Sequence, residues 1–328
     1  MKKWIISIPL LVIAIAVMRV GYFAYKESDF KKNITNYIPG IACWGDSLTF
    51  GAGGDGVTYP EILSQNIGEN IARIPVYNLG VGGESSKQIA ARAGVEKIIL
   101  AQDFEMPEET VPTEIQLVLE DGTPLNILRQ GNAGVEEVSL MGVKGILTIE
   151  QKSITDADYK YYFTRSKKGE SRKIAKGKEL VPSGAYDYNS DISIVFMGTN
   201  GEWTSPEDLI DQYRKMIDHH YEKNKERYLV LGLTTGTKED RTELENKMEE
   251  AFGKRYVNLR EYLSTYDLEK IGISPTLEDK EAMDVGEVPP SLKSDKVHMN
   301  KIGYQLIAEK VYERMMELSY FNYKINLK

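Results

Sequence analysis

Short apolar runs alternate along the chain with longer segments in which apolar residues recur at helical spacing. Five runs predict buried strands: "GIACWGD" (40–46), "IPVYNLGVGG" (74–83), "DISIVFMGTNG" (191–201), "RYLVLGLTTG" (227–236) and "RYVNLREYL" (255–263). The helical spacing occurs in residues 58–71, 85–94, 205–224, 238–253 and 300–320. Strands that alternate with helices predict an α/β fold in which helices cover both faces of a parallel sheet.

The alternation of strand and helix patterns is interrupted between the second and third predicted strands. From 106 to 189 the chain carries short alternating runs, among them "EIQLVLEDG" (114–122) and "YKYYFTRSKKGE" (159–170), with turn signals such as Asp121-Gly122. So long a stretch within one domain is expected to have structure of its own. The pattern predicts a β-rich insertion at 106–189 that divides the main domain into 37–105 and 190–320. We expect the insertion to emerge near the edge of the sheet where a functional site would form. It would then either shape the substrate pocket or have no role in function.

The first 26 residues have the pattern of an export signal or membrane anchor. Lys2 and Lys3 precede an uncharged run from Trp4 to Met18, and a second apolar patch follows Arg19. Counted to Met18, the segment resembles a signal peptide; counted to Tyr25, it is long enough to span a bilayer. In both cases the rest of the chain is expected outside the cytoplasm, secreted or held at the membrane.

Charge and cysteine content narrow the classes of function. The formal net charge is −8, although the first 26 residues carry cations and no acid. Such an acidic body lacks the basic surface that nucleic acid requires, so no nucleic-acid partner is expected. Cys43 is the single cysteine, which excludes an intrachain disulfide, and its place within an apolar strand predicts a buried structural thiol.

The candidate chemistry begins at Ser47, which directly follows the first predicted strand. A serine hydroxyl becomes a useful nucleophile when a base takes its proton, and histidine is the usual base because its pKa lies near neutrality. The chain has three histidines. His219 and His220 are neighbours in a polar helix and are expected at the surface. His298 follows Asp295 by three residues, a spacing at which the carboxylate can bond one ring nitrogen while the other faces a nucleophile.

Four motifs together resemble the SGNH hydrolases, also called GDSL esterases. "GDSLTFG" carries Ser47, "NLGVGGES" carries Gly83, "GTNG" carries Gly198 and Asn200, and Asp295 and His298 form the Asp-x-x-His pair. The motifs occur in the order of the family and span the chain from Gly45 to His298. Gly201 departs from the pattern, because many members have Asp after the Asn.

The resemblance implies a three-layer flavodoxin-like sheet and a Ser47–His298–Asp295 catalytic triad. The backbone N–H groups of Ser47 and Gly83, with the Asn200 amide, are expected to form an oxyanion hole. In an open α/β sheet such residues converge beyond the carboxyl ends of the strands. Asp46, a sequence neighbour of Ser47, is expected to brace the loop. For Trp203 two interpretations stay open: contact with a sugar or acyl group of the substrate, and packing.

These expectations add up to an exported serine esterase that works through an acyl-enzyme. The resemblance favours O-acetyl or other short acyl esters on carbohydrate or cell-envelope substrates and implies no metal and no organic cofactor. Two alternatives remain. An acyltransferase would differ only in passing the acyl group to a sugar hydroxyl, and an inactive relative would serve as a carbohydrate-binding module.

Overall fold

The computed structural model describes residues 34–35, 40–125, 137–152, 158–188, 191–220, 227–321 and 324–325. The expected signal or anchor at 1–26 lies outside these residues. No helix within the described ranges has the length and apolarity needed to cross a membrane. The chain divides into two units, residues 39–318 and the two terminal segments. In the terminal unit, β1 (Ile34–Thr35) pairs with β16 (Lys324–Ile325) in antiparallel fashion.

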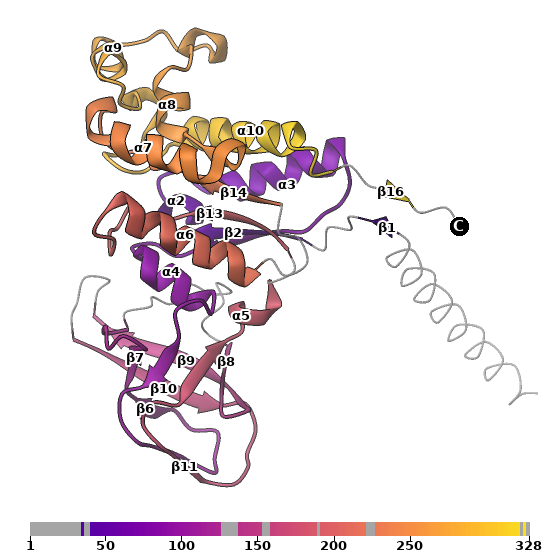
Figure 1. Ribbon diagram of the computed structural model, residues 1–328, viewed down its shortest axis with the longest axis vertical. Helices are drawn as coiled ribbons and strands as arrows, with labels where there is room; N and C mark the ends of the chain where they lie inside the picture. Colours follow the sequence, from indigo (N-terminus) through magenta and orange to yellow (C-terminus); the bar gives the residue numbers. More distant parts are fainter. Residues whose placement is uncertain are drawn as a thin grey trace, which may run out of the picture. The chain divides into compact units, whose positions relative to one another are not determined.

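A five-stranded parallel sheet forms the centre of the larger unit (Figure 1). Its strands, in spatial order, are β15 (Tyr256–Val257), β14 (Tyr228–Leu231), β13 (Ile192–Phe196), β2 (Ile41–Gly45) and β3 (Val76–Gly80). Counted along the chain this order is 5-4-3-1-2, the order of flavodoxin-like sheets. The order reverses between β2 and β13. Ligands of open α/β sheets bind in the crevice at such a point, beyond the carboxyl ends of the strands.

Helices cover both faces of this sheet, as the sequence pattern predicts. One face carries α3 (Tyr59–Asn70) and α10 (Lys301–Glu317), which pack against each other. The other face carries α4 (Ser86–Arg92), α6 (Pro206–His220) and α7 (Lys238–Phe252). The shorter helices are α2 (Ser47–Phe50), α5 (Gly184–Asp187), α8 (Leu259–Ser264) and α9 (Leu277–Asp284), with 3-10 turns at Gly253–Arg255, Leu268–Ile271 and Pro290–Leu292.

The fifth predicted strand is shorter than its apolar run. Only Tyr256 and Val257 pair with β14, and helix α8 starts at Leu259. Asn258 causes the change, because its side chain accepts a hydrogen bond from Glu261 N and so caps the helix. The prediction of a strand over 255–263 is therefore wrong after Val257.

The insertion forms a seven-stranded antiparallel sheet and a separate strand pair. Its order is β6 (Thr113–Ile115), β10 (Tyr159–Arg165), β9 (Val143–Gln151), β8 (Glu137–Leu140), β12 (Glu179–Pro182), β4 (Ile98–Leu100) and β7 (Leu117–Leu119). The pair is β11 (Arg172–Ile174) with β5 (Phe104–Met106). These strands begin at Ile98, before the expected boundary at 106, and end at Pro182.

The insertion joins the core at the amino ends of the parallel strands, not at the edge we expected. Asp191 directly precedes β13, and a Cβ on Gly94, just after α4, would lie 2.2 Å from Ala185 in α5. One hairpin of the insertion, the one that contains Asp121, nevertheless extends toward the carboxyl ends of the parallel strands. Asp121 pairs at 3.0 Å with Lys87, in the first turn of α4, near the opposite edge. The chain therefore enters and leaves the insertion at the amino ends of the parallel strands, away from Ser47. The turn at Asp121 lies nearer to their carboxyl ends.

Candidate active site

Ser47, His298 and Asp295 form a hydrogen-bonded line at the carboxyl end of β2. Ser47 Oγ lies 2.9 Å from His298 Nε2, and His298 Nδ1 lies 2.8 Å from Asp295 Oδ2. When Nδ1–H donates to the carboxylate, Nε2 is left to accept the serine proton. The structure thus brings together three residues that are separated by up to 251 positions in the sequence.

A tight turn holds Asp295 and His298 in register. Asp295 Oδ1 accepts hydrogen bonds from the backbone N–H groups of Val297 and His298, each at 2.8 Å, while Ser294 N donates to His298 O at 2.9 Å. The backbone N–H of His298, followed by the bond from its ring, lowers the pKa of Asp295 to about 2. The carboxylate is therefore ionised throughout the neutral range and keeps the imidazole in one orientation.

Asp46 fixes the start of the short helix that carries Ser47. Its Oδ1 accepts a hydrogen bond from Leu48 N at 2.9 Å, which caps α2. The side chain is fully buried, and this desolvation raises the pKa of Asp46 to about 6 against the opposing bond from Leu48. Asp295, not Asp46, contacts the histidine, so Asp46 has the bracing position that we expected.

The glycine loop after β3 passes close to Ser47. A Cβ on Gly82 would lie 3.8 Å from Ser47 Cβ, and Gly83 has a φ of +83°, a conformation that favours glycine. The next residue, Glu84, accepts a hydrogen bond from Asn200 Nδ2 through its backbone carbonyl at 2.8 Å. The loops that carry Gly83 and Asn200 are therefore joined directly, and both stand beside the β2 end where Ser47 lies.

The loop after β13 also explains the departure at Gly201. Gly201 has a φ of +82° and its carbonyl accepts hydrogen bonds from Ser86 N and Ser86 Oγ. An aspartate would be strained in this left-handed conformation. Trp203 is half-buried, packs against the main core and donates its indole N–H to Gly198 O at 2.8 Å. Of the two interpretations of Trp203, this geometry favours packing.

Cys43 and His219 have the environments we expected, whereas the side chain of His220, also expected at the surface, is not among those described. Cys43 is fully buried, and this burial raises the pKa of its thiol. His219 is exposed and its Nε2 lies 3.3 Å from Ala185 O, remote from Ser47 along α6. Among the described residues no group of three or more His, Cys, Asp or Glu side chains could hold a metal ion.

The motifs assign no role to three polar residues that lie beside the site. Glu84 and Arg92 form a buried ion pair behind the glycine loop, and Glu202 accepts a hydrogen bond from Ser85 Oγ. Glu202 adopts a φ of +62°, which is unusual for a residue with a side chain. The only sequence signal for the ion pair is a glutamate two residues before α4 and an arginine at the end of this helix.

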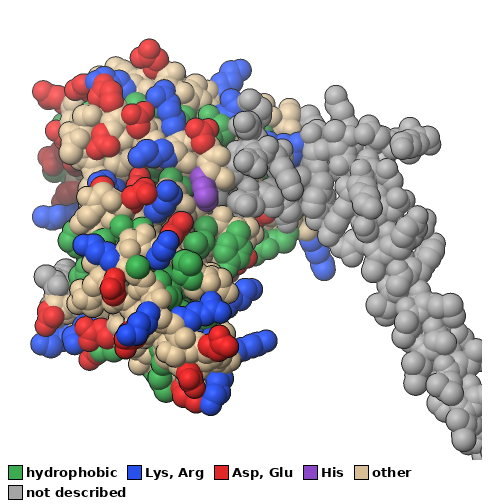
Figure 2. Space-filling view, turned by 60° about the horizontal axis from the view of Figure 1, so that its bottom comes forward, with side chains coloured by type: hydrophobic (Ala, Val, Ile, Leu, Met, Phe, Trp, Pro, Cys, Tyr) green, Lys and Arg blue, Asp and Glu red, His purple; other side chains and the backbone are tan. Residues whose placement is uncertain are grey.

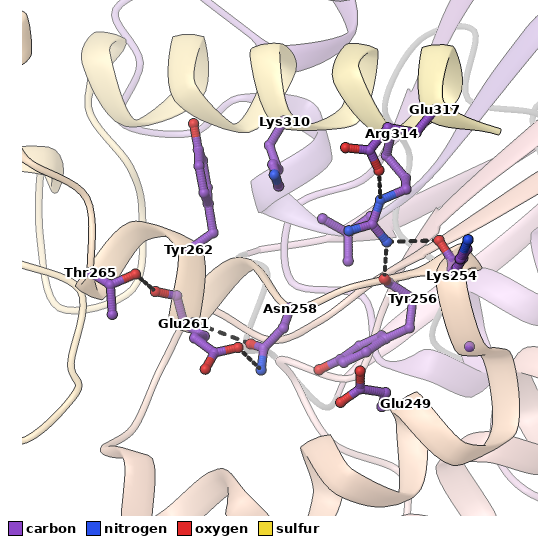
Figure 3. Close-up of a pocket in the computed structure, with 12 residues that line it drawn as sticks. Glu249, Lys254, Tyr256, Asn258, Glu261, Tyr262, Thr265, Lys310, Arg314 and Glu317 are labelled. Carbon is purple, nitrogen blue, oxygen red and sulfur yellow. Dashed lines mark hydrogen bonds and ion pairs between the residues drawn. The ribbon is translucent and has the colours of Figure 1, made fainter. Parts of the chain in front are cut away.

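A groove of about 850 Å³ lies elsewhere, along β15, α8 and α10 (Figure 3). Its Arg314 donates to Glu317 and to the backbone carbonyls of Lys254 and Tyr256, and Lys310 lies 5.0 Å from the centre of the Tyr262 ring. Neither Ser47 nor His298 lines this groove. It contains no nucleophile bonded to a base, so the chemistry points to the end of β2.

Figure 2 shows one face of the molecule, on which charges of both signs occur. Lysine, arginine and acidic side chains are interspersed on the face in Figure 2, with hydrophobic side chains in a band between them. Comparisons with family models, curated proteins and solved structures find nothing that matches this chain.

Proposed function

We propose that this protein is an exported serine esterase of the SGNH type that cleaves acyl esters through an acyl-enzyme. One observation carries the proposal: the 2.9 Å contact between Ser47 Oγ and His298 Nε2, continued at 2.8 Å to Asp295. A nucleophile, a base and an orienting acid in one line are what acyl transfer requires. The line ends where the strand order reverses, the usual place for a site in such a sheet.

The reaction follows from the roles of these groups. Ser47 Oγ attacks the ester carbonyl as His298 Nε2 takes its proton, and Asp295 stabilises the resulting imidazolium. The N–H groups of Ser47 and Gly83 and the Asn200 amide receive the charge that develops on the carbonyl oxygen. His298 then returns the proton to the leaving alcohol. Water, activated by the same histidine, attacks the acyl-enzyme and releases the acid and the free serine.

The substrate class rests on the family resemblance, which favours short acyl esters on carbohydrate or cell-envelope substrates over long lipids. The expected export signal adds only that these substrates lie outside the cytoplasm. No step of this mechanism requires a metal or an organic cofactor. Transfer to a sugar hydroxyl uses the same acyl-enzyme and differs only in the acceptor.

A phosphonate probe tests the proposal. The purified chain is incubated with an active-site-directed phosphonate and weighed intact, and the modified peptide is sequenced. We expect one adduct per chain, on Ser47, and no adduct in Ser47→Ala. Ser139→Ala, in β8 of the insertion, serves as the matched control and should label like the parent. A chain that hydrolyses no short acyl ester and gains no adduct would be a binding module instead.

A further inference from the structure

Behind the glycine loop lies an ion pair that the reaction itself does not use. Arg92 Nε lies 2.6 Å from Glu84 Oε2, and both side chains are completely buried. Burying two charges removes them from water at a large cost, and a hydrophobic pair of the same size is often as stable or more so. Stability alone therefore does not explain why this position holds a charged pair.

The arginine connects the ends of the two strands that lead into the site. Its Nη2 donates to Gly45 O at 3.2 Å, at the end of β2, and to Leu79 O at 2.9 Å, in β3. The guanidinium also lies over Trp44, 5.4 Å from the ring centroid. Because a guanidinium is planar and presents several donors in a fixed fork, it holds these partners at set angles. A lysine has one donor centre and cannot make the same set of bonds.

The glutamate carries this constraint to Asn200. The Glu84 side chain is held by Arg92, and the backbone carbonyl of the same residue accepts Asn200 Nδ2 at 2.8 Å. An asparagine amide has two N–H donors in one plane. Once one N–H is fixed on Glu84 O, the direction of the other is also fixed.

We propose that Arg92 and Glu84 are a positioning pair that orients the Asn200 amide toward the oxyanion. This inference rests on the proposed esterase function. It assigns the pair no contact with substrate. Arg92 fixes Glu84, Glu84 O fixes one N–H of Asn200, and the second N–H is left aimed at the carbonyl oxygen of the ester.

The experiment measures coupling between Arg92 and Asn200 in the full chain. Arg92→Lys is made in the parent and in Asn200→Ala, and kcat is expressed per site titrated with the phosphonate, so that unfolded protein is not counted. Misplacement by about 1 Å can cost roughly 10²-fold, and we expect Arg92→Lys to lower kcat by about that factor with KM nearly unchanged. In Asn200→Ala the same change should cost less than about threefold. Equal factors in the two backgrounds would overturn the proposal.

A second buried arginine–glutamate pair provides the matched control. Arg260 Nε and Nη2 lie 2.5 and 2.6 Å from the Glu245 carboxylate, and Arg260 Nη1 donates to Gly286 O. Their side chains are 3% and 12% exposed, and none of these bonds involves the glycine loop. Arg260→Lys should leave kcat per titrated site within about twofold of the parent. A loss as large as that of Arg92→Lys would indicate general loosening and refute the positioning role.

If Arg92→Lys yields no titratable protein, Glu84→Gln replaces it in the experiment. We expect Glu84→Gln to lower kcat strongly in the parent and only slightly in Asn200→Ala. If neither variant can be titrated while Arg260→Lys can, the pair serves folding, and the proposal is wrong. The proposed function fails separately: a parent chain without esterase activity and without a Ser47 adduct refutes it before any Arg92 variant is made.

Discussion

The two sheets of this protein place their polar groups in different ways. In β2 and β13 every residue is buried, because helices cover both faces of the parallel sheet. In β10 of the insertion buried residues alternate with more exposed ones, and ion pairs such as Lys160–Glu114 lie along its open face. A strand buried on both sides can present a reactive group only where it ends. The comparison explains why Ser47 and Asn200 follow strand ends while the insertion carries its charges along its length.

The comparison predicts that single changes at the ends of the parallel strands will affect chemistry, and that changes within the insertion will affect mainly stability. Exposed ion pairs such as Lys160–Glu114, with side chains 52% and 46% exposed, contribute little to stability because solvent screens them.

Removal of the base should have the largest effect. We expect His298→Ala to lower kcat by roughly 10⁴- to 10⁶-fold, because Ser47 then has no group to accept its proton. His219→Ala, the matched control on α6, should stay within about twofold of the parent. Steady-state hydrolysis of a small activated ester measures both. Comparable losses in the two variants would remove His298 from the mechanism.

A core deletion in the insertion should destabilise without disabling the site. Phe163 is fully buried in β10 and packs edge-on against Phe104, with ring centroids 6.1 Å apart. Phe163→Ala should cost about 3 to 5 kcal/mol in the free energy of unfolding. Turnover of a small ester per titrated site should be unchanged.

The matched variant in the parallel sheet is Phe196→Ala, at the end of β13. Phe196 is equally buried, and its backbone carbonyl lies next to Gly45. We expect a similar loss of stability, together with a lower kcat, because the strand leads into the Asn200 loop. Urea unfolding and ester hydrolysis separate the two effects. If Phe163→Ala lowers kcat as much as Phe196→Ala, then the insertion affects catalysis as strongly as the parallel sheet does, and the proposed difference between the two sheets is wrong.

Loss of one oxyanion donor should be smaller than loss of the base. Asn200→Ala should lower kcat by roughly a hundred- to a thousand-fold, about 3 to 4 kcal/mol, with little change in KM. The reason is that charge on the ester oxygen is concentrated in the tetrahedral intermediate. A higher KM with kcat intact would make Asn200 a ground-state contact and contradict its assignment to the oxyanion hole.

The sequence predicted the parallel sheet and the convergence of Ser47 with His298 and Asp295 for the same physical reason. Continuous apolar runs identify strands buried on both faces, and the residues just beyond them converge by the geometry of parallel strands. The prediction of a strand at 255–263 is wrong after Val257, because Asn258 caps a helix where the apolar pattern still favours a strand. Local hydrogen bonding by one side chain is difficult to weigh against periodicity.

The Arg92–Glu84 pair could not be predicted because burial of a charge depends on tertiary context. Arg92 ends α4, where a basic residue also suits the helix dipole at the surface, and periodicity does not distinguish the two situations. The position of the insertion was missed for a related reason. The length of α4, which returns the chain to the amino ends of the strands, decides where the insertion emerges.

The two sheets should also differ in how one aspartate in each affects stability as pH changes. Burial raises the pKa of Asp46, at the end of β2, to about 6 from 3.8. The folded state therefore binds this proton more tightly than the unfolded state, and stability falls as pH rises from about 4 to 6. Asp46→Asn keeps the cap on Leu48 N and cannot ionise. Its stability relative to the parent should rise over that window, by at most about 3 kcal/mol.

Asp121, on the insertion, should behave in the opposite way and more weakly. Its hydrogen bonds with Thr123, and then that with Lys87, lower the pKa to about 2, so the ionised form stabilises the folded state above pH 4. This contribution is lost as pH falls from about 4 to 2. The side chain is 51% exposed, so solvent screening limits the effect of Asp121→Asn to less than about 1 kcal/mol. Urea unfolding at pH 2 and 4 measures the effect of Asp121→Asn, and at pH 4 and 7 it measures that of Asp46→Asn. If Asp46→Asn shows no gain between these values, Asp46 is not the desolvated carboxylate that its burial at the end of a parallel strand implies.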